Sequence, residues 1–546
     1  MTPFLLLVLA LILSASVTTL LVRVSAHGKA AFMDQPDERK VHDHPIPRTG
    51  GIAVFVGALA AMLSQTGGSD LLLGYTTGAI VLILFGLLDD YRGLDFRLKF
   101  LGQVLACAVM IQISGIGIRT LGELLPGANV GLGPLWPVAT VFFLLTAINA
   151  VNFSDGLDGL AGGISLLILS CVALMAVFSE QAGVLVISLC AVGGLIGFLR
   201  LNVHPAVIFM GDTGSQFLGY TLGVCLIALT QQDSIYSPML PLFLLGTPLL
   251  DLIMVIFQRL LKKKSIFQPD TNHLHHKLLL NGLDHAQAVT LIHVGNLAML
   301  ALGFSLRFVR DYVLAVIYLG LVGTLLATIV GIRKSYGLRM RIQQTLRTGF
   351  QALIAGTTPL YSTPVLSRAA WLAFLAIFAA TFLCFPAMVS GLDKMQGAGF
   401  LAAAVLGAIL YLARQSWFDL YVRVAAYFVM FFAVIVQANA TGASPLVGQV
   451  AQILFVGLGV AYSSYVVLSR ERLLLDGMDI LLIAIAVLAL FTPSTEAYPA
   501  AQVVLTKTLL GGLCINLVMN KVQTFRGPFA LLCLAIYLAI FIRSMV

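Results

Sequence analysis

Residues 71–88 read LLLGYTTGAIVLILFGLL, and this apolar run ends directly on two acids, Asp89 and Asp90. A helix needs about 20 apolar residues to cross the hydrocarbon core of a bilayer. Similar runs recur along the chain, and polar residues gather where several of them end. The pattern predicts an all-α, polytopic membrane protein whose chemistry lies at the ends of its spans.

The composition favours the same class of protein. Of the 546 residues, 59% are hydrophobic and only 10% are Asp, Glu, Lys or Arg, whereas soluble domains carry roughly 25% charged residues. This excludes a soluble enzyme and a disordered scaffold. The formal net charge of +8 is interpreted as loop charge that orients a membrane protein. Nucleic acid is not an expected partner, because no basic cluster is interleaved with stacking aromatic residues.

The apolar blocks predict a transmembrane helical bundle of about 18 spans in two parts. Residues 1–332 hold about 11 of these spans and residues 369–546 about seven. The linker at 333–368 is basic at first and then rich in Gly, Ser, Thr and Pro. Lys and Arg gather in alternate loops, such as 23–49 and 258–286. The rule that cytoplasmic loops collect basic residues then places the N-terminus outside.

Candidate site residues lie in four loops that this topology assigns to the cytoplasmic side. They are Asp89, Asp90 and Lys99; Asn149, Asn152, Asp155 and Asp158; Asn202 and Asp212; and His273, His275 and His276. Carboxylate and amide oxygens suit Mg²⁺, which also takes substrate phosphates as ligands. Phosphoryl transfer needs a metal cation, basic groups around the phosphates and an oriented nucleophile. These loops therefore predict a phosphoryl-transfer site at the membrane edge.

Simpler interpretations exist for each group taken alone. A single acid at a helix end is commonly a cap or a solvated charge, and the three histidines also fit a transition-metal cluster. Gly156, Gly211 and Gly214 would let the backbone approach a phosphate. Ion-coupled transport would place ionisable residues near the bilayer midplane, where only Asp251 and His293 are candidates in the first part of the chain. The position of the acids favours an enzyme that joins a water-soluble donor to a lipid phosphate.

Over residues 30–330 the chain resembles the polyprenyl-phosphate N-acetylhexosamine-1-phosphate transferases, which are of the glycosyltransferase family 4 type. The motifs that carry the resemblance are residues 34–42 (DQPDERKVH), 47–51 (PRTGG), 88–91 (LDDY), 152–161 (NFSDGLDGLA), 209–215 (FMGDTGS) and 273–276 (HLHH). The form of the histidine motif is similar to the undecaprenyl-phosphate GlcNAc-1-phosphate transferase branch. Nothing in residues 350–546 matches the motifs of the family.

The resemblance implies a reaction. A UDP-amino sugar, UDP-GlcNAc or a derivative, would give its sugar-1-phosphate to undecaprenyl phosphate and release UMP. The family uses Mg²⁺, with Mn²⁺ as an alternative. Such enzymes begin cell-wall or lipopolysaccharide O-antigen synthesis at the bacterial inner membrane, with the active site facing the cytoplasm. A homodimer and contacts with other glycan-assembly proteins are further expectations.

The resemblance also implies roles for residues. Asp89 and Asp90 match the paired catalytic aspartates, which together with Asp212 would bind the metal. The expected substrate-binding residues are Lys99, Asn152, Asp155, Asp158, Asn202, His273, His275 and His276. Direct attack by the acceptor phosphate and a covalent aspartyl intermediate both remain open as mechanisms. A lipid-linked saccharide transporter or flippase is the alternative function, for the whole chain or for the C-terminal spans of a fusion, and a docking role for those spans is a third.

Overall fold

The computed structural model describes residues 3–26, 33–34, 45–63, 69–231, 234–263 and 273–334. All of them belong to one compact unit, which comprises Met1–Ala352 and Asp476–Leu481. The seven spans expected in residues 369–546, and almost all of the linker at 333–368, lie outside the described residues. The total of about 18 spans therefore stays a prediction.

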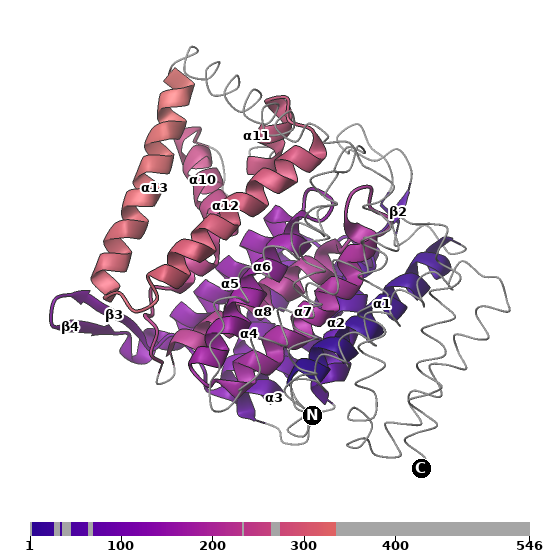
Figure 1. Ribbon diagram of the computed structural model, residues 1–546, viewed down its shortest axis with the longest axis horizontal. Coiled ribbons are helices and arrows are strands. Elements are labelled where there is room, and N and C mark those ends of the chain that lie inside the picture. The colour runs from indigo at the N-terminus through magenta and orange to yellow at the C-terminus, as the bar shows by residue number, and fades with distance from the viewer. Residues whose placement is uncertain are drawn as a thin grey trace, which may run out of the picture. The chain divides into compact units, whose positions relative to one another are not determined.

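Helices make up most of the described chain (Figure 1). In chain order they are α1 (Pro3–Ala26), α2 (Gly50–Leu63), α3 (Asp70–Arg92), α4 (Phe96–Ser114), α5 (Trp136–Ser154), α6 (Leu160–Phe178), α7 (Ala182–Asn202), α8 (Gly211–Gln231), α9 (Pro241–Leu244), α10 (Gly246–Leu261), α11 (Leu274–Leu280), α12 (His285–Ser305) and α13 (Asp311–Lys334). A short 3₁₀ turn, Gly133–Leu135, leads into α5.

The predicted class, a helical membrane protein, is confirmed. Within the described ranges, eight helices are long and apolar enough to cross a membrane, namely α3 to α8, α12 and α13. The other three apolar blocks expected before residue 333 also form helices, α1, α2 and α10. Of these, α2 and α10, with 14 and 16 residues, are shorter than that criterion requires, and α1 contributes the shorter apolar segment Leu9–Ser25.

Helices α6, α7 and α8 form the interior of the described unit. In their most apolar windows 94%, 83% and 100% of residues are buried, against 39% or less for α3, α4 and α5. Small residues let neighbouring backbones approach, which is how helices commonly associate in membranes. A Cβ added at Gly193 or Gly197 of α7 would overlap backbone oxygens of α1. Glycine at these positions permits α1 to pack directly on α7.

Two short antiparallel strand pairs complete the described fold. β1 (Met33–Asp34) pairs with β2 (Ile46–Pro47), between α1 and α2. β3 (Thr120–Leu125) pairs with β4 (Ala128–Gly131), in the connection from α4 to α5. Because α4 separates this second hairpin from residues 96–99, it lies at the other end of the spans from Lys99. The Asp311 carboxylate of α13 accepts a hydrogen bond from Glu123 N in β3, 2.7 Å away.

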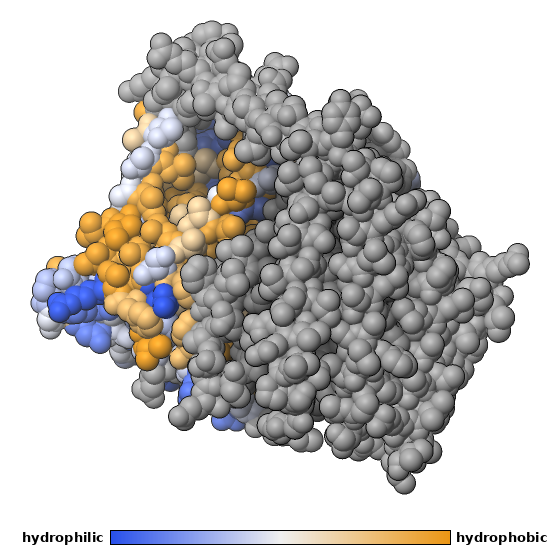
Figure 2. Space-filling model, viewed as in Figure 1, coloured by the Kyte–Doolittle hydropathy of each residue, from blue (hydrophilic) through white to orange (hydrophobic). Residues whose placement is uncertain are grey.

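The surface over α12 and α13 is largely apolar (Figure 2). Val316 and Leu319 of α13 are 67% and 68% exposed, and only 11% of the most apolar window of this helix is buried. Such a surface suits contact with lipid.

Candidate active site

A sharp turn between α3 and α4 brings the first two site residues together. Gly93 ends α3 with φ +67°, a left-handed value that glycine adopts without strain, and its N–H donates to Asp89 O at 2.8 Å. Helix α4 begins three residues later at Phe96. Leu94 N donates to Asp89 Oδ1 (2.8 Å), and Lys99 Nζ, one turn into α4, lies 3.0 Å from Asp89 Oδ2.

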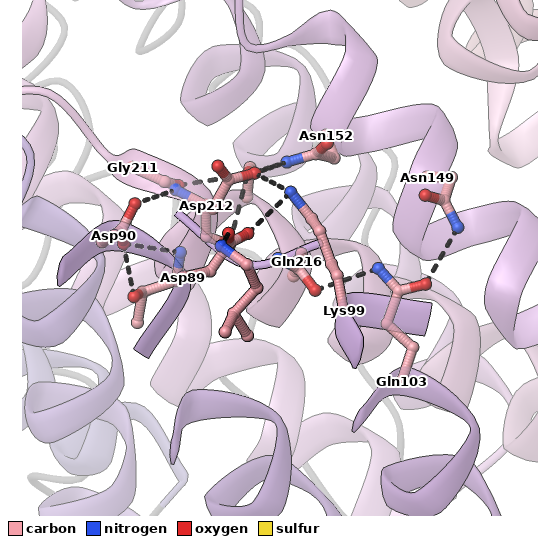
Figure 3. A network of polar contacts seen from close by, with 12 residues as sticks. Asp89, Asp90, Lys99, Gln103, Asn149, Asn152, Gly211, Asp212 and Gln216 are labelled. Atoms are coloured by element: carbon pink, nitrogen blue, oxygen red, sulfur yellow. Dashed lines mark hydrogen bonds and ion pairs between the residues drawn. The ribbon is translucent and has the colours of Figure 1, made fainter. Parts of the chain in front are cut away.

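Helices α5 and α8 add their ends to this pair (Figure 3). Lys99 Nζ also lies 2.5 Å from Asp212 Oδ1, in the first turn of α8. Asn152, near the end of α5, donates from Nδ2 to the same oxygen at 2.7 Å and to Ser215 Oγ at 2.8 Å. Asp89, Lys99, Asn152 and Asp212 therefore meet at one rim of the bundle, and they come from three of the four predicted loops.

Asp90 faces a different group from its neighbour Asp89. Its Oδ1 accepts from Asp212 N (2.9 Å), and its Oδ2 accepts from Thr213 N (3.0 Å) and Thr213 Oγ1 (2.5 Å). Both oxygens thus cap the N-terminus of α8, whose first N–H groups have no partner within the helix. A carboxylate there is also stabilised by the helix dipole. Asp90 holds the turn that carries Asp212.

Asp155 lies just beyond α5 in an environment that disfavours its charge. Burial, together with the nearby carboxylates of Asp212, Asp90 and Asp158, raises the pKa of Asp155 to about 7, while the Arg48 guanidinium opposes the rise. The rim therefore concentrates more negative charge than its cations balance. A metal ion or a basic ligand group would be favoured there.

Two other predicted substrate-binding residues, Asn202 and Asp158, and the candidate residue Asn149 make internal contacts. Asn202 is buried, and its amide accepts from Gly159 N (3.1 Å) and donates to Ile208 O (2.9 Å). Asp158 Oδ2 binds His204 Nδ1 (2.7 Å) and Ala206 N (3.1 Å). These side chains join the loop after α5 to the loop after α7. Asn149 donates to Gln103 Oε1 (3.1 Å), which places it beside the buried Gln103–Gln216 pair instead of the acidic centre.

The histidine segment approaches the same rim. The ring of His273 lies 5.3 Å from the ring of Phe153, the residue after Asn152, and a Cβ at Gly156 would overlap His275 Nε2. The rings of His275 and His276 lie 4.2 Å apart and are tilted by 44°. Burial, together with the neighbouring His276, lowers the pKa of His275 to about 3. His275 is therefore neutral at physiological pH.

Asp251 of α10 fixes this segment and was not expected to take part in the site. Its Oδ2 binds His273 Nδ1 (2.9 Å) and its Oδ1 accepts from Leu274 N (2.8 Å), so that it caps α11. The only sequence signal was a carboxylate within an apolar block. Arg48, which lies near Asp155, was also missed as a site residue, although it belongs to the PRTGG motif.

The glycines expected beside a phosphate instead make room for protein atoms. A Cβ at Gly211, where φ is +72°, would overlap Arg48 O and lie 2.9 Å from Asp90 Oδ2. A Cβ at Gly214 would overlap Met210 and approach Gly51. These glycines allow the 47–51 and 209–214 segments to pack closely, which fixes Asp212.

The three predicted metal ligands do not converge as one group. Within the described ranges, the His, Cys, Asp and Glu group that could hold a metal comprises Asp158, His204 and His285. Their ligand atoms all lie within 4.8 Å of one another, and the His204 and His285 rings stack at 4.2 Å with an interplanar angle of 21°. Asp90 is turned to α8, which leaves Asp89 and Asp212 as the pair of carboxylates at the centre. Mg²⁺ typically takes one or two carboxylates together with substrate phosphates, so this pair fits it.

Comparison with known proteins shows the family of the chain. Residues 72–230 match the model of glycosyl transferase family 4. A probable undecaprenyl-phosphate N-acetylglucosaminyl 1-phosphate transferase of Bacillus subtilis (strain 168) is 38% identical over 268 residues, which cover 49% of this chain and 75% of the relative. A decaprenyl-phosphate N-acetylglucosaminephosphotransferase of Mycolicibacterium smegmatis is 35% identical over 308 residues, covering 50% and 74%. An undecaprenyl-phosphate alpha-N-acetylglucosaminyl 1-phosphate transferase of Yersinia pestis is 31% identical over 299 residues, covering 53% and 82%.

The fold and the site define a polytopic membrane transferase with an acidic centre at the ends of its spans. The chain belongs to glycosyl transferase family 4. This confirms the family predicted from the motifs, and its named relatives transfer a sugar phosphate to polyprenyl phosphates.

Proposed function

We propose that the protein transfers N-acetylglucosamine-1-phosphate, or the phosphate of a closely related amino sugar, from its UDP derivative to undecaprenyl phosphate. The products are undecaprenyl-pyrophosphoryl-sugar and UMP. The observation that carries the proposal is the meeting of Asp89, Lys99, Asn152 and Asp212 at one rim. An acid, a cation and amide groups at a membrane edge are what a reaction between a soluble donor and a lipid phosphate needs.

The acceptor phosphate is assigned to the Asp89–Lys99 side of the centre. Residues next to this pair are apolar and exposed, with Leu88 40%, Phe96 57% and Phe100 48% accessible. A polyprenyl chain can lie against such a face while its phosphate reaches Lys99. Because the second ionisation of a phosphate monoester lies near pH 6, the acceptor is mostly ionised at neutral pH. Asp89 then serves mainly to orient the acceptor and the Lys99 ammonium.

Asp212 and Asp89 are the residues that would hold Mg²⁺, with Mn²⁺ as a substitute, and substrate phosphates would complete its ligand set. When bound, the ion supplies charge neutralisation on the donor diphosphate. Asp90 keeps Asp212 in place from the N-terminus of α8. Asn152 fixes the orientation of the Asp212 carboxylate through its 2.7 Å hydrogen bond.

The reaction is proposed as a direct displacement. An oxygen of the acceptor phosphate attacks the β-phosphorus of the donor. The bond from that phosphorus to the bridging oxygen breaks, and UMP leaves with the oxygen. Lys99 holds negative charge on the reacting phosphates. Asp155, His273, His275 and His276 are proposed to contact the nucleotide or the sugar, and Asn202 and Asp158 to act through the loops that they join.

The proposed location is the bacterial inner membrane, with the N-terminus outside and the active site facing the cytoplasm. Basic residues in the loops on the site's side of the sequence support this orientation. Because UDP-sugars are made in the cytoplasm, the site that binds them must face that side of the membrane. Initiation of a cell-wall or O-antigen glycan is the biological role that fits this reaction.

The decisive experiment uses purified full-length protein with a panel of labelled UDP-N-acetyl sugars, undecaprenyl phosphate and Mg²⁺. We expect a lipid-linked product with UDP-GlcNAc or one of its relatives, and its loss in Asp212→Asn. No lipid product with any donor, together with no effect of Asp212→Asn, would refute the enzyme. Labelled sugar phosphate on the protein that disappears in Asp89→Asn would replace direct displacement with a covalent route. Arg97→Gln, an exposed change on α4, serves as a control.

A further inference from the structure

Residues 47–51, at the junction of β2 and α2, are hydrogen-bonded to the loop that precedes Asp212. The carbonyl of Pro47, the last residue of β2, accepts from Phe209 N at 2.7 Å. Gly50 N and Gly51 N donate to the carbonyls of Phe209 and Met210, each at 2.9 Å. These three backbone bonds fasten residues 47–51 along the loop that leads into Asp212. Arg48 is thereby carried to the edge of the acidic rim.

The Arg48 head group is fixed on one side and open on the other. It forms an ion pair with Asp34 of β1, whose side chain is only 8% exposed, while the side chain of Arg48 is 39% exposed. The Arg48 carbonyl borders Gly211, beside Asp90 Oδ2. The Arg48 charge also opposes the rise in the pKa of Asp155. The guanidinium is therefore anchored within electrostatic reach of the centre.

We propose that Arg48, oriented by Asp34, binds the diphosphate of the donor nucleotide sugar, which deepens and rests on the proposed function. Two phosphate-bearing substrates must meet at this rim, and two cations from different elements face it. Lys99 comes from α4, beside the exposed apolar residues Phe96 and Phe100, and this is the side from which a lipid approaches. Arg48 directly follows β2 and lies outside the spans, on the side from which a water-soluble donor would approach.

The chemistry of the side chain agrees with this assignment. A guanidinium offers several N–H donors in a planar fork, which suits the paired oxygens of a diphosphate better than the point charge of lysine does. Asp34 takes only part of that fork and restricts its rotation. Asp34 is accordingly a positioning residue, and its effect on the donor should pass through Arg48.

The test measures donor binding and turnover in purified full-length protein. Arg48→Gln should weaken UDP-GlcNAc binding by about 10- to 100-fold, because charge-assisted hydrogen bonds to phosphate are lost. The KM for undecaprenyl phosphate and the inhibition constant of uridine, which has no phosphate, should change less than about twofold. Arg48→Lys should fall between Arg48→Gln and the unaltered protein. Arg97→Gln, which also removes an arginine charge, should bind UDP-GlcNAc normally.

The role of Asp34 is tested by combining variants. Asp34→Asn should raise the KM for UDP-GlcNAc in the unaltered background and add nothing to Arg48→Gln, because residues that act through one another are not additive. Equal weakening of uridine and UDP-GlcNAc, a rise confined to the acceptor KM, or an effect on thermal stability alone would overturn the inference. If the unaltered protein neither binds nor converts any UDP-sugar, the proposed function itself fails, and that result is distinct from a failure of Arg48 alone.

Discussion

The variant Asp90→Asn tests whether Asp90 holds the N-terminus of α8 or binds the metal. Asp90 accepts hydrogen bonds from Asp212 N, Thr213 N and Thr213 Oγ1 at 2.9, 3.0 and 2.5 Å. Asn keeps one acceptor oxygen and turns an NH₂ group toward the remaining donors. One hydrogen bond to a charged acceptor is worth about 1.5–3 kcal/mol, and a carboxylate at a helix N-terminus adds about 0.3–1 kcal/mol. Asparagine also relieves the cost of burying a charge, so we expect Asp90→Asn to destabilise the protein by about 1–3 kcal/mol.

Asp89→Asn is the matched control, since it makes the same chemical change one residue away. Its amide oxygen can still accept from Leu94 N, and mainly the ion pair with Lys99 is lost. The Asp89 side chain is only 8% exposed and that of Lys99 24%, but Lys99 keeps its ion pair with Asp212, so we expect this loss to cost only about 1 kcal/mol. Asp89→Asn should therefore unfold close to the unaltered protein, although it should be far less active. Asp90→Asn should be the less stable of the two variants, and Asp89→Asn should be the less active.

Thermal unfolding in detergent with EDTA measures the stability without bound metal, and Mg²⁺ titration of activity measures the metal requirement. Asp90→Asn should show a lower unfolding midpoint and an unchanged half-saturating Mg²⁺ concentration. If its midpoint is unchanged while its Mg²⁺ requirement rises as in Asp212→Asn, Asp90 is a metal ligand and the capping argument is wrong.

Three further predictions follow from the same rim. Because the pKa of Asp155 is raised to about 7, its folded form retains a proton that the unfolded chain releases, so stability falls as pH rises from about 4 to 7. In EDTA, Asp155→Asn should unfold at a higher temperature than the unaltered protein at pH 8, with no gain at pH 4. Because the pKa of His275 is lowered to about 3, the unfolded chain binds a proton below about pH 6.5 while His275 in the folded chain stays neutral. The stability of the folded protein therefore falls as the pH drops below about 6.5. His275→Gln should therefore lose less stability between pH 6.5 and pH 4, as followed by thermal unfolding. Gly156→Ala should displace His275 and lower kcat/KM for the UDP-sugar by about 10- to 100-fold, while Gly131→Ala, which has open space around it, should leave it unchanged.

The apolar pattern was sufficient to predict most of the architecture before residue 333. The run at 71–88 becomes α3 and ends at the acids, as expected, because about 20 apolar residues have few other stable states in a bilayer. The motifs also identified loops that meet at the site. Asp89, Lys99, Asn152 and Asp212 were all predicted, and they are in contact in the structure.

The roles of neighbouring residues within those motifs were not predictable in the same way. Asn202 and Asp158 match the family pattern, yet their side chains bind backbone groups of adjoining loops. Asp251 appeared to be an isolated buried acid, and only the fold shows that it caps α11 and holds His273. Such contacts join residues 22 to 48 positions apart, and nothing local in the sequence marks them.

Asp89 and Asp90 illustrate what the sequence alone determines and what the tertiary structure decides. The sequence by itself determined that two carboxylates end a span at the membrane edge, because the apolar run and its polar end fix that position. Successive residues on a helix point about 100° apart, so Asp89 and Asp90 must face different neighbours. Only the tertiary structure decided which one meets Lys99 and which one caps α8, because that depends on the helix packed against each face.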